Sequence, residues 1–323
     1  MSASPLISVR ELKKHYTPDG SWLRKGHTVK AVDGVSFDIL PGETFGLVGE
    51  SGCGKSTLGR AILRLFDVTS GEIHFAGQEI AHASEKTLKP LRRRMQAIFQ
   101  DPWSSLNPGM TVQQLVAEPM KIHGYGAQQQ RERAEELLWK VGLKPEHLQR
   151  FPHEFSGGQR QRISIARALS VRPEFVLCDE PLSALDVSVQ AQVVNILQDL
   201  QQELGLTYLF IAHDLSMVRH ISSRIGVMYL GKLVEVAPAG ELYTHPAHPY
   251  TRALLASVPQ PDPRARQLEQ SELQGEIPSP SAEIHGCRFC SRCPHAMPVC
   301  QQEAPVMQEI APQHFTACWL FKP

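Results

Sequence analysis

The sequence predicts an α/β fold with a mostly parallel sheet and an attached helical subdomain. Short apolar runs at residues 44–48, 175–178 and 207–212 are separated by helix-like stretches, which is typical of a parallel sheet. From about residue 106 to residue 172 the strand signals fade, and apolar residues recur at helical spacing, as in RERAEELLWKVGL. These two observations define the fold class.

The elements follow in order along the chain. Residues 1–75 form a strand-rich start, with the alternating segment ISVRELKKHY, a Gly-rich excursion at residues 19–26 and then AVDGVSFDILPGE. The run at 44–48 leads directly into an amphipathic stretch at 55–65, which indicates a buried strand that turns into a helix. After about Ser257 the composition changes to proline and polar residues, which is typical of a linker. We therefore predict two domains, residues 1–256 and a cysteine-rich extension at 257–323.

Charge and hydropathy narrow the function class. Lys+Arg and Asp+Glu both number 33 in a chain of 323 residues, so the basic excess that a nucleic-acid backbone binder needs is missing. The first residues, MSASPLISVR, do not resemble a signal peptide, and the apolar runs end well before the ~20 residues of a membrane span. We expect a cytosolic protein that reaches a membrane only through another protein.

Residues 49–57, GESGCGKST, fit the P-loop pattern of a nucleoside triphosphate site. Glycines let backbone N–H groups point at phosphate oxygens, and the helix that follows adds a favourable dipole. Lys55 is expected to reach the β- and γ-phosphates, and Ser56 to bind Mg²⁺. Alkylation of Cys53, inside the loop, is predicted to block nucleotide binding. The predicted nucleotide contacts here are Gly49, Ser51, Gly52, Cys53, Gly54, Lys55, Ser56 and Thr57.

The apolar segment FVLCDE, residues 175–180, ends in two carboxylates. Asp179 is expected to hold Mg²⁺ through its water shell, and Glu180 to orient the attacking water. A strand that ends in two acids is otherwise an ordinary solvated strand end. The P-loop in the same chain favours the catalytic interpretation.

FSGGQRQR lies directly before a helix-like ISIARALS stretch. Its core, Ser156 with Gly157, Gly158 and Gln159, resembles the signature motif of ABC ATPases, with Phe155 where that family usually has leucine. A hydroxyl and bare N–H groups at a helix N-terminus can bind a γ-phosphate, which in this family belongs to the partner subunit's ATP. Ser156 alone would equally suit a helix N-cap. The resemblance covers nearly the whole chain and implies a P-loop ABC ATPase core with a mixed or parallel sheet, an antiparallel β subdomain and a helical subdomain.

The same resemblance gives roles to single residues elsewhere. Gln100 resembles the Q-loop glutamine that senses Mg²⁺ and the nucleotide, and His213 resembles the switch histidine that contacts the γ-phosphate. Asp186 resembles the D-loop residue at the dimer interface. Tyr16 resembles the aromatic that stacks on adenine, although an aromatic on a strand also suits packing. The implied catalytic set is Glu180, His213, Gln100 and Lys55, with ATP and Mg²⁺ as cofactors and with Ser56, Gln100 and Asp179 as the magnesium ligands.

Longer stretches, above all THPAHPYTRALLASVP followed by GEIPSP, resemble the ATPase subunits of bacterial dipeptide and oligopeptide importers, more closely their F-type subunit. This resemblance implies uptake of di- or oligopeptides at the cytoplasmic face of the bacterial inner membrane. The implied partners are a second ABC ATPase subunit, as a paralogue in a heterodimer, two membrane permease subunits and, indirectly, a periplasmic peptide-binding protein. Nickel and glutathione are alternative cargoes. A soluble ABC ATPase in DNA repair or translation is the alternative from another class.

Five of the seven cysteines fall between Cys287 and Cys318, which in a reducing compartment indicates metal or iron–sulfur ligation. By spacing alone, Cys287, Cys290 and Cys293 resemble the start of a bacterial ferredoxin-type run, although Cys300 lies further on than that run expects. The importer resemblance implies instead a [4Fe-4S] cluster on Cys287, Cys293, Cys300 and Cys318. Zinc also accepts four thiolates, and unliganded buried cysteines are the remaining alternative.

Overall fold

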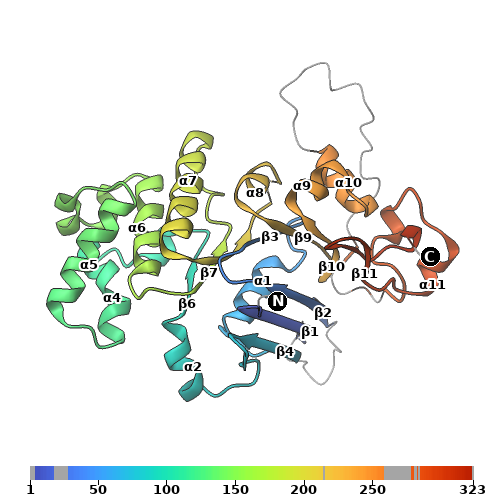
Figure 1. Cartoon of the computed structure of the whole chain (residues 1–323), viewed down its shortest axis with the longest axis horizontal. Coiled ribbons are helices and arrows are strands. Elements are labelled where there is room, and N and C mark those ends of the chain that lie inside the picture. The colour runs from blue at the N-terminus through green and yellow to red at the C-terminus, as the bar shows by residue number, and fades with distance from the viewer. Residues whose placement is uncertain are drawn as a thin grey trace, which may run out of the picture.

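The computed structural model describes residues 4–17, 28–213, 215–257, 278–279, 282 and 284–321. The Gly-rich excursion at 19–26 and most of the predicted linker after Ser257 lie outside the described residues. Within the described ranges the strands form two sheets, with helices between and around them (Figure 1).

The larger sheet has eight strands in the order β11-β12-β10-β9-β3-β8-β7-β6. The five strands from β6 to β9 run parallel, and β10, β12 and β11 continue the sheet as antiparallel strands. The predicted, mostly parallel sheet is therefore confirmed. Its strands are β3 (Thr44–Val48), β6 (Met95–Ile98), β7 (Phe175–Asp179), β8 (Thr207–Ile211), β9 (Arg224–Tyr229), β10 (Lys232–Pro238), β11 (Gln308–Ala311) and β12 (His314–Thr316).

The smaller sheet is antiparallel, with four strands in the order β2-β1-β4-β5. It is the antiparallel β subdomain that the family resemblance implied. Its strands are β1 (Ile7–Tyr16), β2 (Val29–Ile39), β4 (Ser70–Phe75) and β5 (Gln78–Glu79).

Helix α1 (Lys55–Ile62) lies between the two sheets and contacts strands of both. Its buried face, with Leu58 and Ile62, joins an apolar core to which β1, β2 and the inner strands β7 and β8 also contribute. This packing fixes the start of α1, and so the loop before it, against the end of β3. The predicted helix at 55–65 is confirmed, although it ends at Ile62.

The helical subdomain lies at one end of the molecule and the C-terminal elements lie at the other (Figure 1). Amphipathic periodicity explains the helical end, since Leu115, Leu137 and Ile163 from three helices meet in one buried core. The helices are α2 (Glu85–Arg92), α3 (Pro102–Ser105), α4 (Val112–Ile122), α5 (Ala127–Lys140), α6 (Gly157–Leu169), α7 (Val187–Leu204), α8 (Leu215–Ile221), α9 (Ala239–Thr244), α10 (Pro249–Ala256) and α11 (Pro298–Gln302), with short 3₁₀ turns at Pro145–Gln149, Pro152–Glu154, Cys290–Arg292 and Trp319–Phe321.

The C-terminal hairpin β11–β12 is tied to strand β10 by a buried hydrogen bond between side chains. Strand β12 pairs with β10, and His314 Nε2 lies 2.7 Å from Glu235 Oε1, with both residues almost fully buried. The Glu235 carboxylate also accepts hydrogen bonds from the backbone N–H groups of Ala247 and His248, at 2.8 Å each. Part of the predicted extension at 257–323 thus continues the sheet of the first 256 residues.

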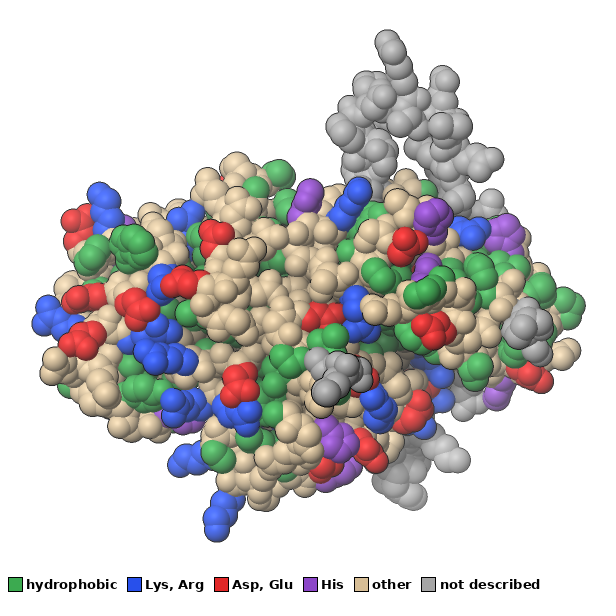
Figure 2. Space-filling view, in the orientation of Figure 1, with side chains coloured by type: hydrophobic (Ala, Val, Ile, Leu, Met, Phe, Trp, Pro, Cys, Tyr) green, Lys and Arg blue, Asp and Glu red, His purple; other side chains and the backbone are tan. Residues whose placement is uncertain are grey.

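No helix in the described part of the chain is long and apolar enough to span a membrane. Figure 2 shows acidic and basic side chains interspersed over the face that it presents, in keeping with the equal numbers of acidic and basic residues.

Candidate functional site

The P-loop connects β3 to α1 and approaches β2 closely. Gly49 and Gly54 have φ angles of 150° and 106°, which a residue with a side chain rarely adopts. A Cβ atom at Gly54 would lie 2.0 Å from the backbone oxygen of Ala31 on β2. Only glycine fits at these two positions, so the spacing of the glycines in the P-loop motif follows from the backbone angles and the close approach to β2.

Lys55 and Ser56 begin helix α1 and point toward different partners. Lys55 is buried, and its Nζ donates hydrogen bonds to the backbone oxygens of Gly49 at 2.7 Å and Glu50 at 3.0 Å. Ser56 Oγ donates to Asp179 Oδ1 at 2.7 Å. A hydroxyl and a carboxylate in contact beside a phosphate loop are suitable oxygen ligands for Mg²⁺.

Asp179, at the end of β7, is 1% exposed and is held from the other side by Arg60 of helix α1. Arg60 donates from Nε to Asp179 Oδ2 at 3.1 Å, and its Nη2 lies 3.0 Å from the same oxygen. Because the carboxylate is paired on both oxygens, its orientation is fixed before any ligand binds.

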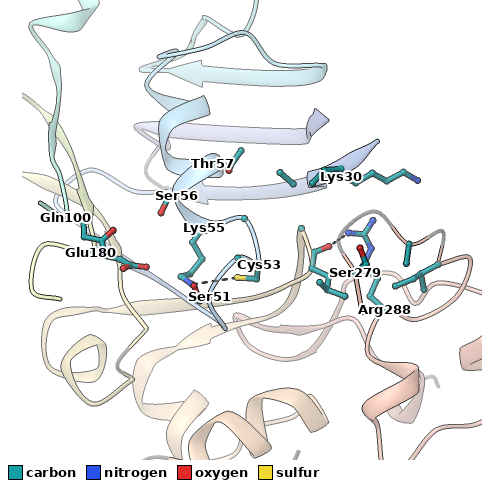
Figure 3. Close-up of a pocket in the computed structure, with 18 residues that line it drawn as sticks. Lys30, Ser51, Cys53, Lys55, Ser56, Thr57, Gln100, Glu180, Ser279 and Arg288 are labelled. Carbon is teal, nitrogen blue, oxygen red and sulfur yellow. Dashed lines mark hydrogen bonds between the residues drawn. The ribbon is translucent and has the colours of Figure 1, made fainter. Parts of the chain in front are cut away.

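Residues 51–57 of the P-loop, with Gln100 and Glu180, line one cavity of about 340 Å³. Figure 3 shows Lys55 of the P-loop with Gln100 and Glu180, which come from other segments of the chain. Glu180 directly follows β7 with a φ of 50°, and its backbone N–H donates to the oxygen of Ile211 at 3.0 Å. The lining includes Ser51, Gly52, Cys53, Gly54, Lys55, Ser56, Thr57, Gln100 and Glu180, each of which was predicted from the sequence.

His213 lies beside Glu180 but lines a smaller, neighbouring cavity. Its Nδ1 is 3.7 Å from Glu180 Oε2, and its side chain is 58% exposed. The histidine is therefore within reach of Glu180 and open to a group that enters from solvent.

The residues of the signature motif lie elsewhere, at the start of α6. Ser156 is the helix N-cap: its Oγ accepts a hydrogen bond from the backbone N–H of Gln159, and the Gln159 side chain accepts one from the backbone N–H of Ser156. Gly158 packs against Val189 of α7 so closely that a Cβ would lie 2.4 Å from Val189 Cγ1. Ser156, Gly157, Gly158 and Gln159 do not line the P-loop cavity, and neither does the exposed Asp186 at the start of α7.

Tyr16 ends β1 and is 43% exposed. The Tyr16 ring packs edge-on against Phe66, with 6.3 Å between the ring centroids. The Lys14 ammonium lies 4.9 Å from the centroid of the Tyr16 ring. Tyr16 is not among the residues that line the P-loop cavity. Its predicted stacking on adenine stays a prediction.

The residues of one wall of the cavity were not predicted from the sequence motifs. Val29, Lys30 and Ala31 at the start of β2 line it, and so do Ser279, Ala282, Ile284 and Arg288 from the C-terminal region (Figure 3). Arg288 forms an ion pair with Asp33 and donates to the backbone oxygen of Leu230. Burial alone would raise the pKa of Asp33, but the Arg288 charge and the hydrogen bond from His15 lower it.

The five C-terminal cysteines line one small cavity. Burial raises the pKa of the Cys287 thiol to about 12, and the neighbouring Cys300, Cys318 and Cys293 thiols add to that rise. Among the described residues, no group of three or more His, Cys, Asp or Glu side chains is arranged to hold a metal ion. The donor chemistry suits four-thiolate ligation, but the cavity, at about 10 Å³, has no room for a cluster as its walls stand.

Comparisons with known proteins identify the family of the chain. Residues 32–183 match the model of the ABC transporter family, and residues 234–300 match the oligopeptide/dipeptide transporter C-terminal region. A putative oligopeptide transport ATP-binding protein of Bacillus subtilis, YkfD, is 56% identical over 100% of this chain and 97% of its own length. The oligopeptide transport ATP-binding protein AppF of the same species is 53% identical over 98% and 97%.

Solved structures show the same cassette. A dimeric ATP-binding cassette, MJ0796, in a post-hydrolysis state with ADP and Pi, aligns with a TM-score of 0.65 at 27% identity, over 72% of this chain and 98% of that one. Fold and P-loop site together define an ATP-binding cassette ATPase. The chain belongs to the ABC transporter family and, within it, to the ATP-binding subunits of oligopeptide/dipeptide transporters.

Proposed function

We propose that this chain hydrolyses ATP to power the uptake of di- or oligopeptides through a membrane ABC importer. The observation that carries the proposal is the convergence of Lys55, Gln100 and Glu180 on one cavity, beside the Ser56–Asp179 pair. Relatives that are 52–56% identical over nearly the full chain are named as oligopeptide or peptide transport or import ATP-binding proteins.

Each residue has a distinct role in phosphoryl transfer. Lys55 and the backbone N–H groups at 51–57 bind the phosphates, while Ser56, Asp179 and Gln100 hold Mg²⁺, which supplies charge neutralisation when bound. Glu180 orients the attacking water, and His213 contacts the γ-phosphate. Gly49 shapes the loop, and Tyr16 stacks on the adenine.

Hydrolysis needs a second subunit because the signature residues do not reach the chain's own P-loop cavity. In our proposal Ser156 to Gln159 bind the γ-phosphate of an ATP held by the partner, and Asp186 lies at the interface between the two subunits. The partner is a paralogous ABC ATPase, and the pair docks on two permease subunits at the cytoplasmic face of the bacterial inner membrane. A periplasmic binding protein delivers the peptide.

For the C-terminal cysteines we propose a [4Fe-4S] cluster on Cys287, Cys293, Cys300 and Cys318, with zinc as the alternative. The walls of the cavity of about 10 Å³ between these cysteines would have to move apart to admit a cluster. All five cysteines line one cavity, which supports a shared site, and Cys290 is less buried than Cys287, Cys293 and Cys318. Metal, iron and sulfide analysis of protein purified without oxygen tests this proposal. Protein with neither iron nor zinc at stoichiometric levels would overturn it.

The function is tested by capturing the tagged, full-length chain from solubilised membranes. Co-purification of two permease subunits and a second ATPase is expected, with ATPase activity that rises when a peptide-loaded binding protein is added. Stimulation by nickel- or glutathione-loaded binding protein instead would reassign the cargo. Recovery from the cytosol with no membrane subunit would support the soluble ABC ATPase.

A further inference from the structure

One residue of the P-loop, Glu50, turns its side chain away from the nucleotide cavity. The cavity is lined by residues 51–57 but not by Glu50. Its carboxylate instead meets Arg292, which lies 242 residues further along the chain, inside the cysteine-rich region. Arg292 donates from Nη1 to Oε2 at 2.8 Å and from Nη2 to Oε1 at 3.0 Å. This two-pronged geometry is the strongest form of arginine–carboxylate pair.

The pair is shielded from water and backed by aromatic rings. The side chains of Arg292 and Glu50 are 5% and 21% exposed. Arg292 Nη1 also donates to the hydroxyl of Tyr229 at 3.4 Å, and the Tyr229 ring packs against those of Tyr250 and Phe289 at 4.6 and 5.3 Å between centroids. Because the surroundings are this dry, the charges interact strongly and either one would be costly alone.

Tyr250 holds the same P-loop residue by its backbone. The Glu50 N–H donates to the Tyr250 hydroxyl at 2.9 Å, and Tyr250 lies fully buried in α10. Glu50 is thus fixed at its carboxylate and at its backbone by residues beyond the ABC core match at 32–183. The Glu50 carbonyl in turn accepts from Lys55 Nζ, so these contacts reach the phosphate-binding lysine.

Glu50 places a negative charge in a loop that binds a polyanion. Unpaired, its carboxylate would repel the triphosphate, and the loop would lose a fixed point. Arg292 cancels this charge and holds the side chain on the far side of the loop.

We propose that Arg292 is a positioning residue for ATP binding, which neutralises Glu50 and keeps the P-loop in its phosphate-binding shape. This proposal rests on the nucleotide site proposed above and adds the C-terminal region to it. The C-terminal region therefore supports nucleotide affinity in addition to any metal it binds.

The test is ATP affinity of the full-length chain, measured with a fluorescent ATP analogue. Arg292→Gln is expected to raise the Kd roughly tenfold, because it leaves Glu50 charged and unpaired. The double variant Glu50→Gln/Arg292→Gln removes both charges and is expected to return to within roughly threefold of wild type. In turnover, Arg292→Gln is expected to raise KM and to leave kcat within about twofold.

The matched control is Arg94→Gln, which breaks a two-pronged pair with Glu174 outside the nucleotide cavity, at 2.5 and 2.7 Å. It is expected to leave ATP affinity unchanged. Wild-type affinity in Arg292→Gln, or a double variant as weak as the single one, would overturn the proposal. If Arg292→Gln does not fold, Arg292→Lys replaces it, with a roughly two- to fivefold weakening of ATP binding expected because lysine keeps the charge but not the two-pronged geometry; unchanged affinity would then overturn the proposal. Wild-type protein that binds no ATP would instead overturn the proposed nucleotide site.

Discussion

Cys53 lies in the P-loop with its thiol almost fully buried, at 4% exposure. Burial raises the pKa of this thiol, and the nearby Lys55 charge only partly opposes the rise. Since the thiolate is the nucleophile, Cys53 is a poor target for alkylation at neutral pH despite its place in the loop. The pKa of Cys290 is also raised by burial, but Cys290 is partly exposed.

We expect iodoacetamide at pH 7.5 to label Cys290 and to leave Cys53 unmodified, as read by peptide mass spectrometry. Below the raised pKa the thiolate fraction of Cys53 grows about tenfold per pH unit, so its labelling is expected to speed up toward pH 9. Once Cys53 is labelled, ATP binding is expected to be lost. Labelling of Cys53 as fast as Cys290 at neutral pH, or full ATP affinity after complete Cys53 labelling, would contradict this account.

The turn between β9 and β10 contacts the P-loop through a backbone hydrogen bond. Gly231 has a φ of 82°, donates its N–H to the Cys53 oxygen at 2.8 Å, and accepts from the Asp33 N–H at 2.8 Å. A Cβ at Gly231 would lie 2.6 Å from the backbone oxygen of Lys30. Gly42 has a similar φ of 73°, but nothing lies within 4 Å of a Cβ placed there. Alanine at Gly42 would therefore meet only backbone strain, whereas alanine at Gly231 would meet both backbone strain and a steric clash.

Gly231→Ala is expected to lower the free energy of unfolding by roughly 3 kcal/mol and to weaken ATP binding, because backbone atoms must move beneath the P-loop. Gly42→Ala is expected to cost only about 1 kcal/mol and to leave ATP affinity unchanged. Denaturant unfolding and nucleotide titration of both variants measure these quantities. Equal effects of the two substitutions on ATP binding would show that the turn does not support the loop.

The sequence predicted those elements whose signals are local. The run at 44–48, the glycines at 49 and 54 and the helix after them needed only neighbouring residues, and β7, β8 and α7 followed from apolar runs and helical periodicity. Contacts between distant segments left no such signal. The pairing of β12 with β10, the position of Arg288 in the nucleotide cavity and the contact of Arg292 with Glu50 all depend on packing of residues far apart in the chain.

At the scale of the whole molecule, the proposed function gives the chain one half of each of two ATP sites. One half is the P-loop cavity with Glu180, at the carboxyl ends of the parallel strands; the other is the N-terminus of α6, in the helical subdomain (Figure 1). In the proposed mechanism neither half is complete alone, so binding of ATP between two subunits would close the pair, and hydrolysis would open it.

Glu180→Gln is expected to separate these two events. It keeps the shape of the side chain but removes the charge that we propose orients water, so ATP binding should persist while turnover falls by a factor of at least about 100. In the membrane complex the variant is expected to retain ATP and a closed ATPase pair, measured by nucleotide content after rapid desalting and by cross-linking between the subunits.

The control, Glu174→Gln, changes the glutamate just before the opposite end of β7, where it pairs with Arg94, and should turn over normally. Because both variants alter a carboxylate beside the same strand, a loss of turnover confined to Glu180→Gln assigns the effect to the nucleotide site, whereas normal turnover by Glu180→Gln would remove Glu180 from the catalytic set.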